Sequence, residues 1–143
     1  MQPNAKHFLL VEDDEDHAEI VLHSIKQHDA PHSVDHVWDG VAALEYLRGE
    51  GQYASRKTPD VILLDLKLPK LEGLEVLEKI KSDPALRTIP VVVLTTSDAE
   101  IDRAKAYHSH ANSYVVKPVD YKSFIALVED LSAYWGQWNR GPR

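Results

Sequence analysis

The chain has 143 residues, which is the length of one folded domain. Its formal net charge is −7, the opposite sign to that of proteins that neutralise nucleic-acid phosphates, so we expect no nucleic-acid partner. The lack of cysteine excludes disulfides, zinc–thiolate sites and cysteine nucleophiles. No apolar run approaches the roughly 18 residues of a membrane span and no signal peptide is visible, so we expect a cytoplasmic protein without membrane contact.

Short apolar runs alternate along the sequence with amphipathic segments. Runs of this length without polar interruption are typical of strands buried on both faces of a parallel sheet. The alternation predicts an open α/β sheet with helices on both faces. In order along the sequence, the expected elements are a strand at 8–11, a helix at 15–28, a weaker strand at 34–38, a helix at 40–48, a strand at 61–64, a helix at 72–82, a strand at 91–94, a weak helix at 98–109, a strand at 114–116 and a last helix starting near Asp120.

Three details accompany this pattern. Asp14 or Asp16 is the expected cap of the first helix. The polar stretch 49–59 is long for a connection between a helix and a strand, so we predict a surface insertion there. The weak helix at 98–109 has few apolar anchors, namely Ile101, Ala104 and Tyr107.

The polar residues that follow the predicted strands carry the functional signal. Ligands of open α/β sheets bind beyond the carboxyl ends of the strands, so residues at these ends are expected to meet in one crevice. The residues concerned are Glu12, Asp13 and Asp14 after the first strand, Asp65 after the third, Thr95 and Thr96 after the fourth, and Lys117 after the fifth.

This combination of groups favours a divalent cation. Two carboxylates about 5 Å apart repel by roughly 3 kcal/mol at an effective dielectric constant of 20, and a cation removes most of this cost. A few oxygen ligands suit Mg²⁺, which completes its coordination with waters and a phosphate. No G-x-G-x-x-G follows the first strand and no G-x-x-x-x-G-K-[ST] occurs, which counts against a Rossmann or P-loop protein.

With these residues in place, the protein resembles a response-regulator receiver domain, the phosphoacceptor of two-component signalling, from about residue 7 to 131. The matching motifs are Val11-Glu12-Asp13, Leu64-Asp65 followed by Pro69 and Gly73, Thr95 thirty residues after Asp65, and Lys117-Pro118 twenty-two residues later. The resemblance implies a flavodoxin-like (βα)5 fold with strand order 2-1-3-4-5. It also implies a single receiver domain over 1–143, with a core at 7–131 and an aromatic extension at 132–143. The polar insertion and the Tyr134-Trp135 ending are similar to the small stand-alone regulators of cyanobacterial and bacterial phytochrome kinases.

The resemblance assigns a role to each matching position. Asp65 would be phosphorylated, and the Mg²⁺ site would consist of Asp13, Asp65 and the backbone carbonyl of Lys67 as direct ligands and Glu12 acting through water. Thr95 and Lys117 would each bond a phosphoryl oxygen, and Thr95 and Tyr114 would form the conformational switch. The Lys117–Pro118 peptide bond would be cis.

The implied function is that of a phosphoacceptor in a phosphorelay, not of an enzyme with an external substrate. A sensor histidine kinase, of the phytochrome type, would donate the phosphoryl group, and the 98–138 face would then signal to a partner. Lys67 and Thr96 depart from the residues usual in the family, which predicts an altered lifetime of the phosphoryl group. One alternative is a Mg²⁺-dependent aspartyl-phosphate phosphatase, although a haloacid-dehalogenase-like enzyme would want an Asp where Lys67 stands. The other is a pseudo-receiver that binds partners without phosphorylation.

The C-terminal segment carries an aromatic stripe. Phe124, Val128, Leu131, Trp135 and Trp138 are spaced 4, 3, 4 and 3, and the first three are expected to cover the sheet. Tyr134, Trp135 and Trp138 are expected beyond it, as part of a homodimer interface on the 98–138 face. The alternative is that they fold back on their own domain. His28, His32 and His36 are four residues apart and would align on a helix, but Pro31 breaks that helix. We therefore interpret the eight histidines as scattered surface residues.

Overall fold

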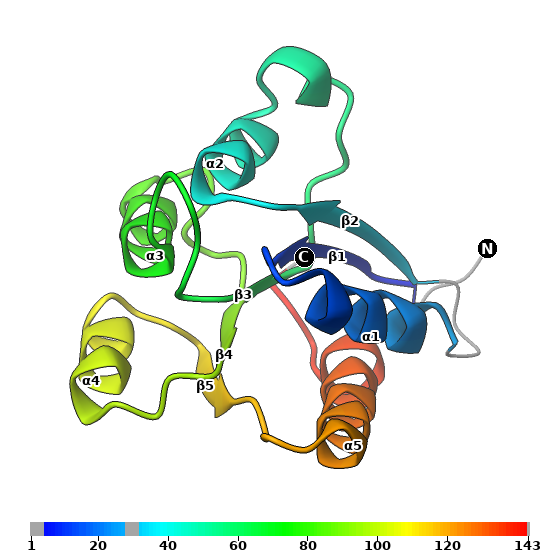
Figure 1. Cartoon of the computed structure of the whole chain (residues 1–143). Helices are drawn as coiled ribbons and strands as arrows, with labels where there is room; N and C mark the ends of the chain where they lie inside the picture. The colour runs from blue at the N-terminus through cyan, green and yellow to red at the C-terminus, as the bar shows by residue number, and fades with distance from the viewer. Residues whose placement is uncertain (1–4, 28–31, 143) are drawn as a thin grey trace.

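Five parallel strands form one sheet in the computed structural model, which describes residues 5–27 and 32–142 (Figure 1). Their order across the sheet is β2-β1-β3-β4-β5, which confirms the predicted flavodoxin-like α/β topology. The strands are β1 (His7–Val11), β2 (Ser33–Val37), β3 (Val61–Leu64), β4 (Val91–Thr95) and β5 (Ser113–Val116).

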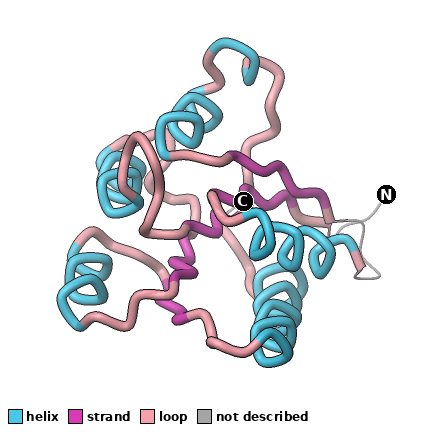
Figure 2. The backbone as a smooth tube through the Cα atoms, viewed as in Figure 1, coloured by secondary structure: helices cyan, strands magenta, loops and turns pink. Residues whose placement is uncertain are grey.

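Helices cover both faces of the sheet, α1 and α5 on one side and α2, α3 and α4 on the other (Figures 1 and 2). The alternation of side chains along a strand explains the two layers. Phe8 and Leu10 of β1 join the core under α1 and α5, whereas Leu9 and Val11 join the core under α2 and α3. The helices are α1 (Glu15–Lys26), α2 (Gly40–Arg48), α3 (Gly73–Ser82), α4 (Glu100–His108) and α5 (Tyr121–Ala133).

The predicted helices are all present, with ends that differ by one or two residues. The first helix was expected to reach residue 28, which lies outside the described residues, together with Pro31. Asp14, and not Asp16, caps α1, since its Oδ1 accepts the N–H of His17 at 3.1 Å. In the described ranges, no helix is long and apolar enough to cross a bilayer.

Two elements are less buried than the sequence predicted. Ser113–Val116 is half-buried along its whole length, because β5 is an edge strand and its runs of apolar residues are covered less completely than those of central strands. In α4 only Ala106 is buried, whereas Ile101 and Tyr107 are 62% and 50% exposed. The expectation that Ile101, Ala104 and Tyr107 anchor this helix is therefore wrong, because all three are exposed and Ala106 takes that place.

The insertion at 49–59 folds back on the end of α2. It contains one 3-10 turn, η1 (Gly51–Tyr53). The guanidinium of Arg56 donates to the backbone carbonyls of Tyr46 at 2.9 Å and Leu47 at 2.6 Å. These carbonyls belong to the last turn of the helix. That of Tyr46 also accepts the N–H of the capping residue Gly49 at 3.0 Å, so the guanidinium of Arg56 adds to the cap at the C-terminal end of α2.

The three aromatic residues expected at an interface differ in their burial. After α5 the backbone forms a π-helical turn, η2 (Tyr134–Trp138), in which Trp135 is half-buried against the core under α1 and α5. Tyr134 and Trp138 are 50% and 75% exposed. The expectation of an exposed position is thus wrong for Trp135, because the stripe that begins at Phe124 continues onto the core through this residue.

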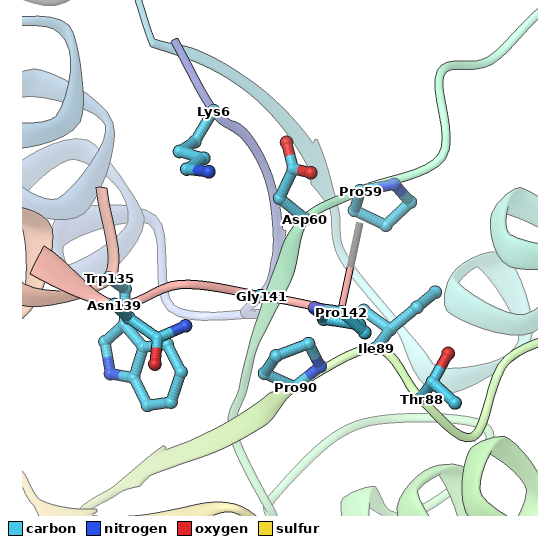
Figure 3. A pocket seen from close by; sticks show the side chains of 10 residues that line it. All are labelled: Lys6, Pro59, Asp60, Thr88, Ile89, Pro90, Trp135, Asn139, Gly141 and Pro142. Atoms are coloured by element: carbon cyan, nitrogen blue, oxygen red, sulfur yellow. The ribbon is translucent and has the colours of Figure 1, made fainter. Parts of the chain in front are cut away.

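The tail at 139–142 lies beside residues that precede β1, β3 and β4, and thus at the amino ends of these strands (Figure 3). Figure 3 shows Gly141 and Pro142 beside Pro90, with Trp135 and Asn139 further back along the tail. The hollow that they line has a cavity volume of about 20 Å³, which is room for one water molecule. This hollow is therefore a packing defect under the tail and not a ligand site.

Candidate functional site

Three carboxylates meet at the carboxyl ends of β1 and β3. Glu12 and Asp13 directly follow β1, and Asp65 directly follows the neighbouring strand β3. One oxygen from each carboxylate can be chosen so that all three lie within 4.8 Å of one another. Glu12 and Asp65 are buried, at 1% and 7% exposure, while Asp13 is exposed. The group is thus an acidic pocket with one open side.

Lys117 inserts its ammonium group into this pocket from the end of β5. Its Nζ donates to Glu12 Oε1 at 2.5 Å and to Asp65 Oδ2 at 3.0 Å, and its side chain is 1% exposed. The backbone N–H of Lys117 donates to the carbonyl of Thr95 at 2.7 Å, which ties its backbone to the end of β4. One cation therefore compensates two buried carboxylates, and its long side chain spans the width of β4 to do so.

The pocket separates the pKa values of its two buried acids. Burial raises the pKa of Glu12 to about 7, and the charge of Asp65 adds to this effect against the opposing pull of Lys117. Burial also raises the pKa of Asp65, but Lys117, Glu12 and the N–H of Lys67 outweigh it, so the net pKa lies below the usual value. At neutral pH Asp65 is ionised, while Glu12 carries a proton for part of the time.

The donor set fits a hard divalent cation. Glu12, Asp13 and Asp65 offer only oxygen ligands. Their oxygens lie within 4.8 Å of one another, close to the separation of about 4 Å between opposite ligands of a Mg²⁺ octahedron. The exposure of Asp13 leaves room on that side for waters and for a phosphoryl oxygen. The raised pKa of Glu12 implies that cation binding, which favours the ionised carboxylate, strengthens as pH rises through about 7.

Thr95 and Tyr114 are connected through Ser97. Thr95 ends β4 and is fully buried, and its Oγ1 accepts the N–H of Ser97 at 3.3 Å. The hydroxyl of Tyr114 donates to the carbonyl of Ser97 at 2.9 Å, and Ser97 Oγ donates to Asp102 in the first turn of α4 at 2.6 Å. A hydrogen-bonded path thus runs from the end of β4 to β5 and α4.

Lys67 contacts Asp65 through its backbone. Its N–H donates to Asp65 Oδ1 at 3.2 Å, while its side chain is exposed.

No peptide bond is cis in the part of the protein that the structure describes, so the expected cis bond between Lys117 and Pro118 is wrong. The trans form is the one that X–Pro bonds favour, by roughly 0.5–1 kcal/mol.

One residue of this pocket was missed by the sequence analysis. The Nδ1 atom of His17 lies 2.9 Å from Lys117 Nζ. The interpretation of the histidines as surface residues is also wrong for His7 and His32, which are buried. A signal was available for His17, since the third position of a helix that starts at an acidic loop faces back toward that loop.

The aromatic residues of the extension lie away from this pocket. Tyr121 begins α5 close after Lys117, and Tyr134 follows its last residue. Thirteen helical residues span roughly 20 Å. Tyr134, Trp135 and Trp138 therefore lie far from the pocket and belong to a separate surface feature.

The fold and the pocket define a class of protein. A doubly wound parallel sheet whose carboxyl ends hold three acids, a buried lysine and a threonine has the donors needed to bind a divalent cation and a phosphoryl group. Residues 8–129 match the family model of the response regulator receiver domain. The protein belongs to this family and is a signalling phosphoacceptor.

Several relatives match over nearly the whole sequence. The "Probable methanogenesis regulatory protein FilR2" of Methanothrix harundinacea is 44% identical over 135 residues, covering 94% of this protein and 86% of FilR2. Response regulator Rcp1 of a Synechocystis species is 40% identical over 130 residues, covering 91% of this protein and 88% of Rcp1. The crystal structure of Mn²⁺-bound Rcp1 has a TM-score of 0.94 at 38% identity and covers 96% of this protein and 99% of that one.

A phosphorylated relative has the same architecture. The crystal structure of the phosphorylated cyanobacterial phytochrome response regulator RcpA has a TM-score of 0.94 and 41% identity, covering 97% of this protein and 99% of that one. The protein is thus similar over nearly its whole length to response regulators of phytochromes, as its insertion and aromatic ending predicted.

Proposed function

We propose that Asp65 accepts a phosphoryl group from a phosphohistidine of a sensor histidine kinase. A carboxylate oxygen of Asp65 forms the new P–O bond while the P–N bond of the donor breaks, and the bonding electron pair returns to the imidazole of the donor. The observation that carries the proposal is the position of Asp65 at the end of β3, within the cluster of three carboxylates and 3.0 Å from the Lys117 ammonium; this ammonium lowers the pKa of Asp65 and so favours the ionised, nucleophilic carboxylate.

The neighbouring residues supply the electrostatic part of the reaction. Glu12, Asp13, Asp65 and the carbonyl of Lys67 would hold Mg²⁺, which when bound neutralises charge on the transferring phosphoryl group. Lys117 gives up its contact with Asp65 and donates to a phosphoryl oxygen instead. Thr95, at the end of the adjacent strand, donates its hydroxyl to another.

The proposal includes a route for the output signal. A Thr95 hydroxyl that turns toward the phosphoryl group no longer accepts from the N–H of Ser97, and this change reaches Tyr114 and α4 through Ser97. Because Ala106 is the one buried residue of α4, this helix can move at low cost. The 98–138 face thereby changes shape on phosphorylation and signals to a partner.

A phytochrome-type kinase is the proposed donor. The support is the full-length similarity to RcpA and Rcp1, one of them named as a phytochrome response regulator. Because such a kinase uses ATP, we propose that phosphotransfer to this protein takes place in the cytoplasm. The test is phosphotransfer from an autophosphorylated bacteriophytochrome kinase, which should label the wild type and not Asp65→Asn.

A small-molecule donor tests the site itself. The wild type, incubated with Mg²⁺ and acetyl phosphate, should form a hydroxylamine-sensitive acyl phosphate that Asp65→Asn does not form. Rapid release of phosphate from unrelated esters, without a persistent adduct, would support the phosphatase alternative. Absence of any adduct with an intact metal site would support a pseudo-receiver.

The lifetime of the adduct depends on two exposed residues beside the pocket. Lys67 follows Asp65 by two positions and Thr96 follows Thr95, and both side chains are open to solvent. We infer that they control the approach of the hydrolysing water. Lys67→Asn and Thr96→Ala should change the dephosphorylation rate, and unchanged rates in both variants would refute this part.

We further propose that the 98–138 face mediates homodimerisation. Its support is the exposure of apolar side chains on α4 and after α5, namely Ile101, Tyr107, Tyr134 and Trp138. Light scattering after size exclusion should show a dimer that Trp138→Ala weakens. Trp38→Ala, at a 49% exposed tryptophan on the far edge of the sheet, is the matched control.

A further inference from the structure

The Lys117 ammonium has three donors, and each has its own acceptor. Two are the carboxylates of Glu12 and Asp65, and the third is the imidazole Nδ1 of His17 at 2.9 Å. An ammonium group cannot accept a hydrogen bond, so His17 Nδ1 must present its lone pair to Lys117. This hydrogen bond therefore requires the tautomer that carries its proton on Nε2. The 3.7 Å separation between Nδ1 and Asp14 Oδ2 is too long to compete for this nitrogen.

Two contacts fix the imidazole in this orientation. The backbone N–H of His17 donates to the capping carboxylate of Asp14 at 3.1 Å, which sets the start of α1. The ring meets Phe124 of α5 edge-to-face, with centroids 5.1 Å apart and an interplanar angle of 72°. Phe124 is itself buried, so the ring of His17 rests against a rigid part of the core.

His17 differs from the other two acceptors because its hydrogen bond with Lys117 need not change on phosphorylation. Glu12 and Asp65 are the proposed metal ligand and nucleophile, so their hydrogen bonds with Lys117 change when a cation and a phosphoryl group arrive. His17 has no such duty and can remain bonded to the ammonium throughout. We propose that His17 is a positioning residue. Its Nδ1 anchors the Lys117 ammonium, while another N–H of this ammonium exchanges a carboxylate acceptor for a phosphoryl oxygen. This inference rests on the proposed function.

A second reading of His17 is that it only fills space. It lines a hollow of about 420 Å³ between α1 and α5, together with Ile20, Pro118 and Phe124. Two substitutions distinguish the readings. His17→Asn keeps an acceptor near the position of Nδ1 but fills less space, whereas His17→Leu fills the space and removes the acceptor. Both keep the backbone N–H that Asp14 caps.

The first measurement is the initial rate of phosphorylation by acetyl phosphate in saturating Mg²⁺. A hydrogen bond to a charged group predicts a rate about tenfold lower for His17→Leu, with His17→Asn within about threefold of the wild type. Thermal unfolding of each variant checks that the fold is kept. The proposal is overturned if His17→Leu reacts like the wild type, or if His17→Asn is the slower variant.

The second measurement needs no phosphorylation. Nitrogen-15 NMR of the metal-free protein should show His17 protonated at Nε2 alone, and a Lys117 ammonium signal that His17→Leu loses and His17→Asn keeps. A proton on Nδ1, or an ammonium signal unchanged in His17→Leu, overturns the proposal. If acetyl phosphate labels neither the wild type nor any variant, the proposed function fails, while this experiment still decides whether His17 anchors Lys117.

Discussion

Replacing Gly73 with alanine tests how tightly α3 is packed against the acidic pocket. Gly73 begins α3, and its N–H donates to the carbonyl of Leu66 at 2.8 Å. A Cβ at this position would lie 2.3 Å from the carbonyl oxygen of Asp65 and 2.5 Å from the Cα of Leu66. Both atoms belong to the backbone that carries the phosphoacceptor, so no side-chain rotation can relieve the overlap.

The size of the effect follows from these distances. An ordinary contact requires the Asp65 loop and α3 to separate by about 1 Å. Overpacking of this kind costs typically 1–3 kcal/mol, and we take the upper end because backbone must move. Alanine recovers up to about 1 kcal/mol as the better helix former. The expected net loss in unfolding free energy is about 2 kcal/mol, or roughly 4–8 °C in Tm.

Urea unfolding of metal-free protein measures this loss, with Gly141→Ala as the control. A Cβ at Gly141 meets no atom within 4 Å, so this variant should match the wild type. The shift of the Asp65 loop should also slow phosphorylation by acetyl phosphate. Equal stability of Gly73→Ala and Gly141→Ala would refute the packing argument.

Three further predictions concern other parts of the molecule. Lys81→Met should lower the unfolding free energy by about 2 kcal/mol, because Lys81 Nζ donates to two carbonyls of the α3–β4 loop and to Asn112; exposed Lys79→Met is the control, and equal losses would contradict the reasoning. Burial lowers the pKa of His7 below 6.5, so unfolding free energy should fall as pH drops below about 6.5, and His7→Gln should show a smaller fall. Mg²⁺ at 100 times its Kd should stabilise the wild type by about 2.7 kcal/mol and Asp13→Asn much less, as read by Tm with and without chelator.

The sheet and the membership of the pocket could be predicted because they depend on local patterns. Uninterrupted apolar runs mark β1, β3 and β4, and the residue that follows a buried parallel strand necessarily lies at its carboxyl end. That rule alone predicts that Glu12, Asp65 and Lys117 lie in one pocket.

Other features depend on contacts between distant segments and were not predicted. The exposure of β5 and α4 reflects their place at the sheet edge, which a run of valines does not reveal. Trp135 could not be assigned to the core before the path of the backbone after α5 was known. The bond between His17 and Lys117 joins residues 100 positions apart, and the acidic loop drew attention to carboxylates alone.

The central claim is that the Asp65 carboxylate, held beside Lys117 among Glu12 and Asp13, receives the phosphoryl group. Borohydride reduction of the protein after reaction with acetyl phosphate and Mg²⁺ converts a phosphorylated aspartate to homoserine, which peptide mass spectrometry locates. The account predicts a single homoserine, at position 65, that is absent when Mg²⁺ is removed. Homoserine at any other aspartate, or the same yield in Asp65→Asn, would contradict it.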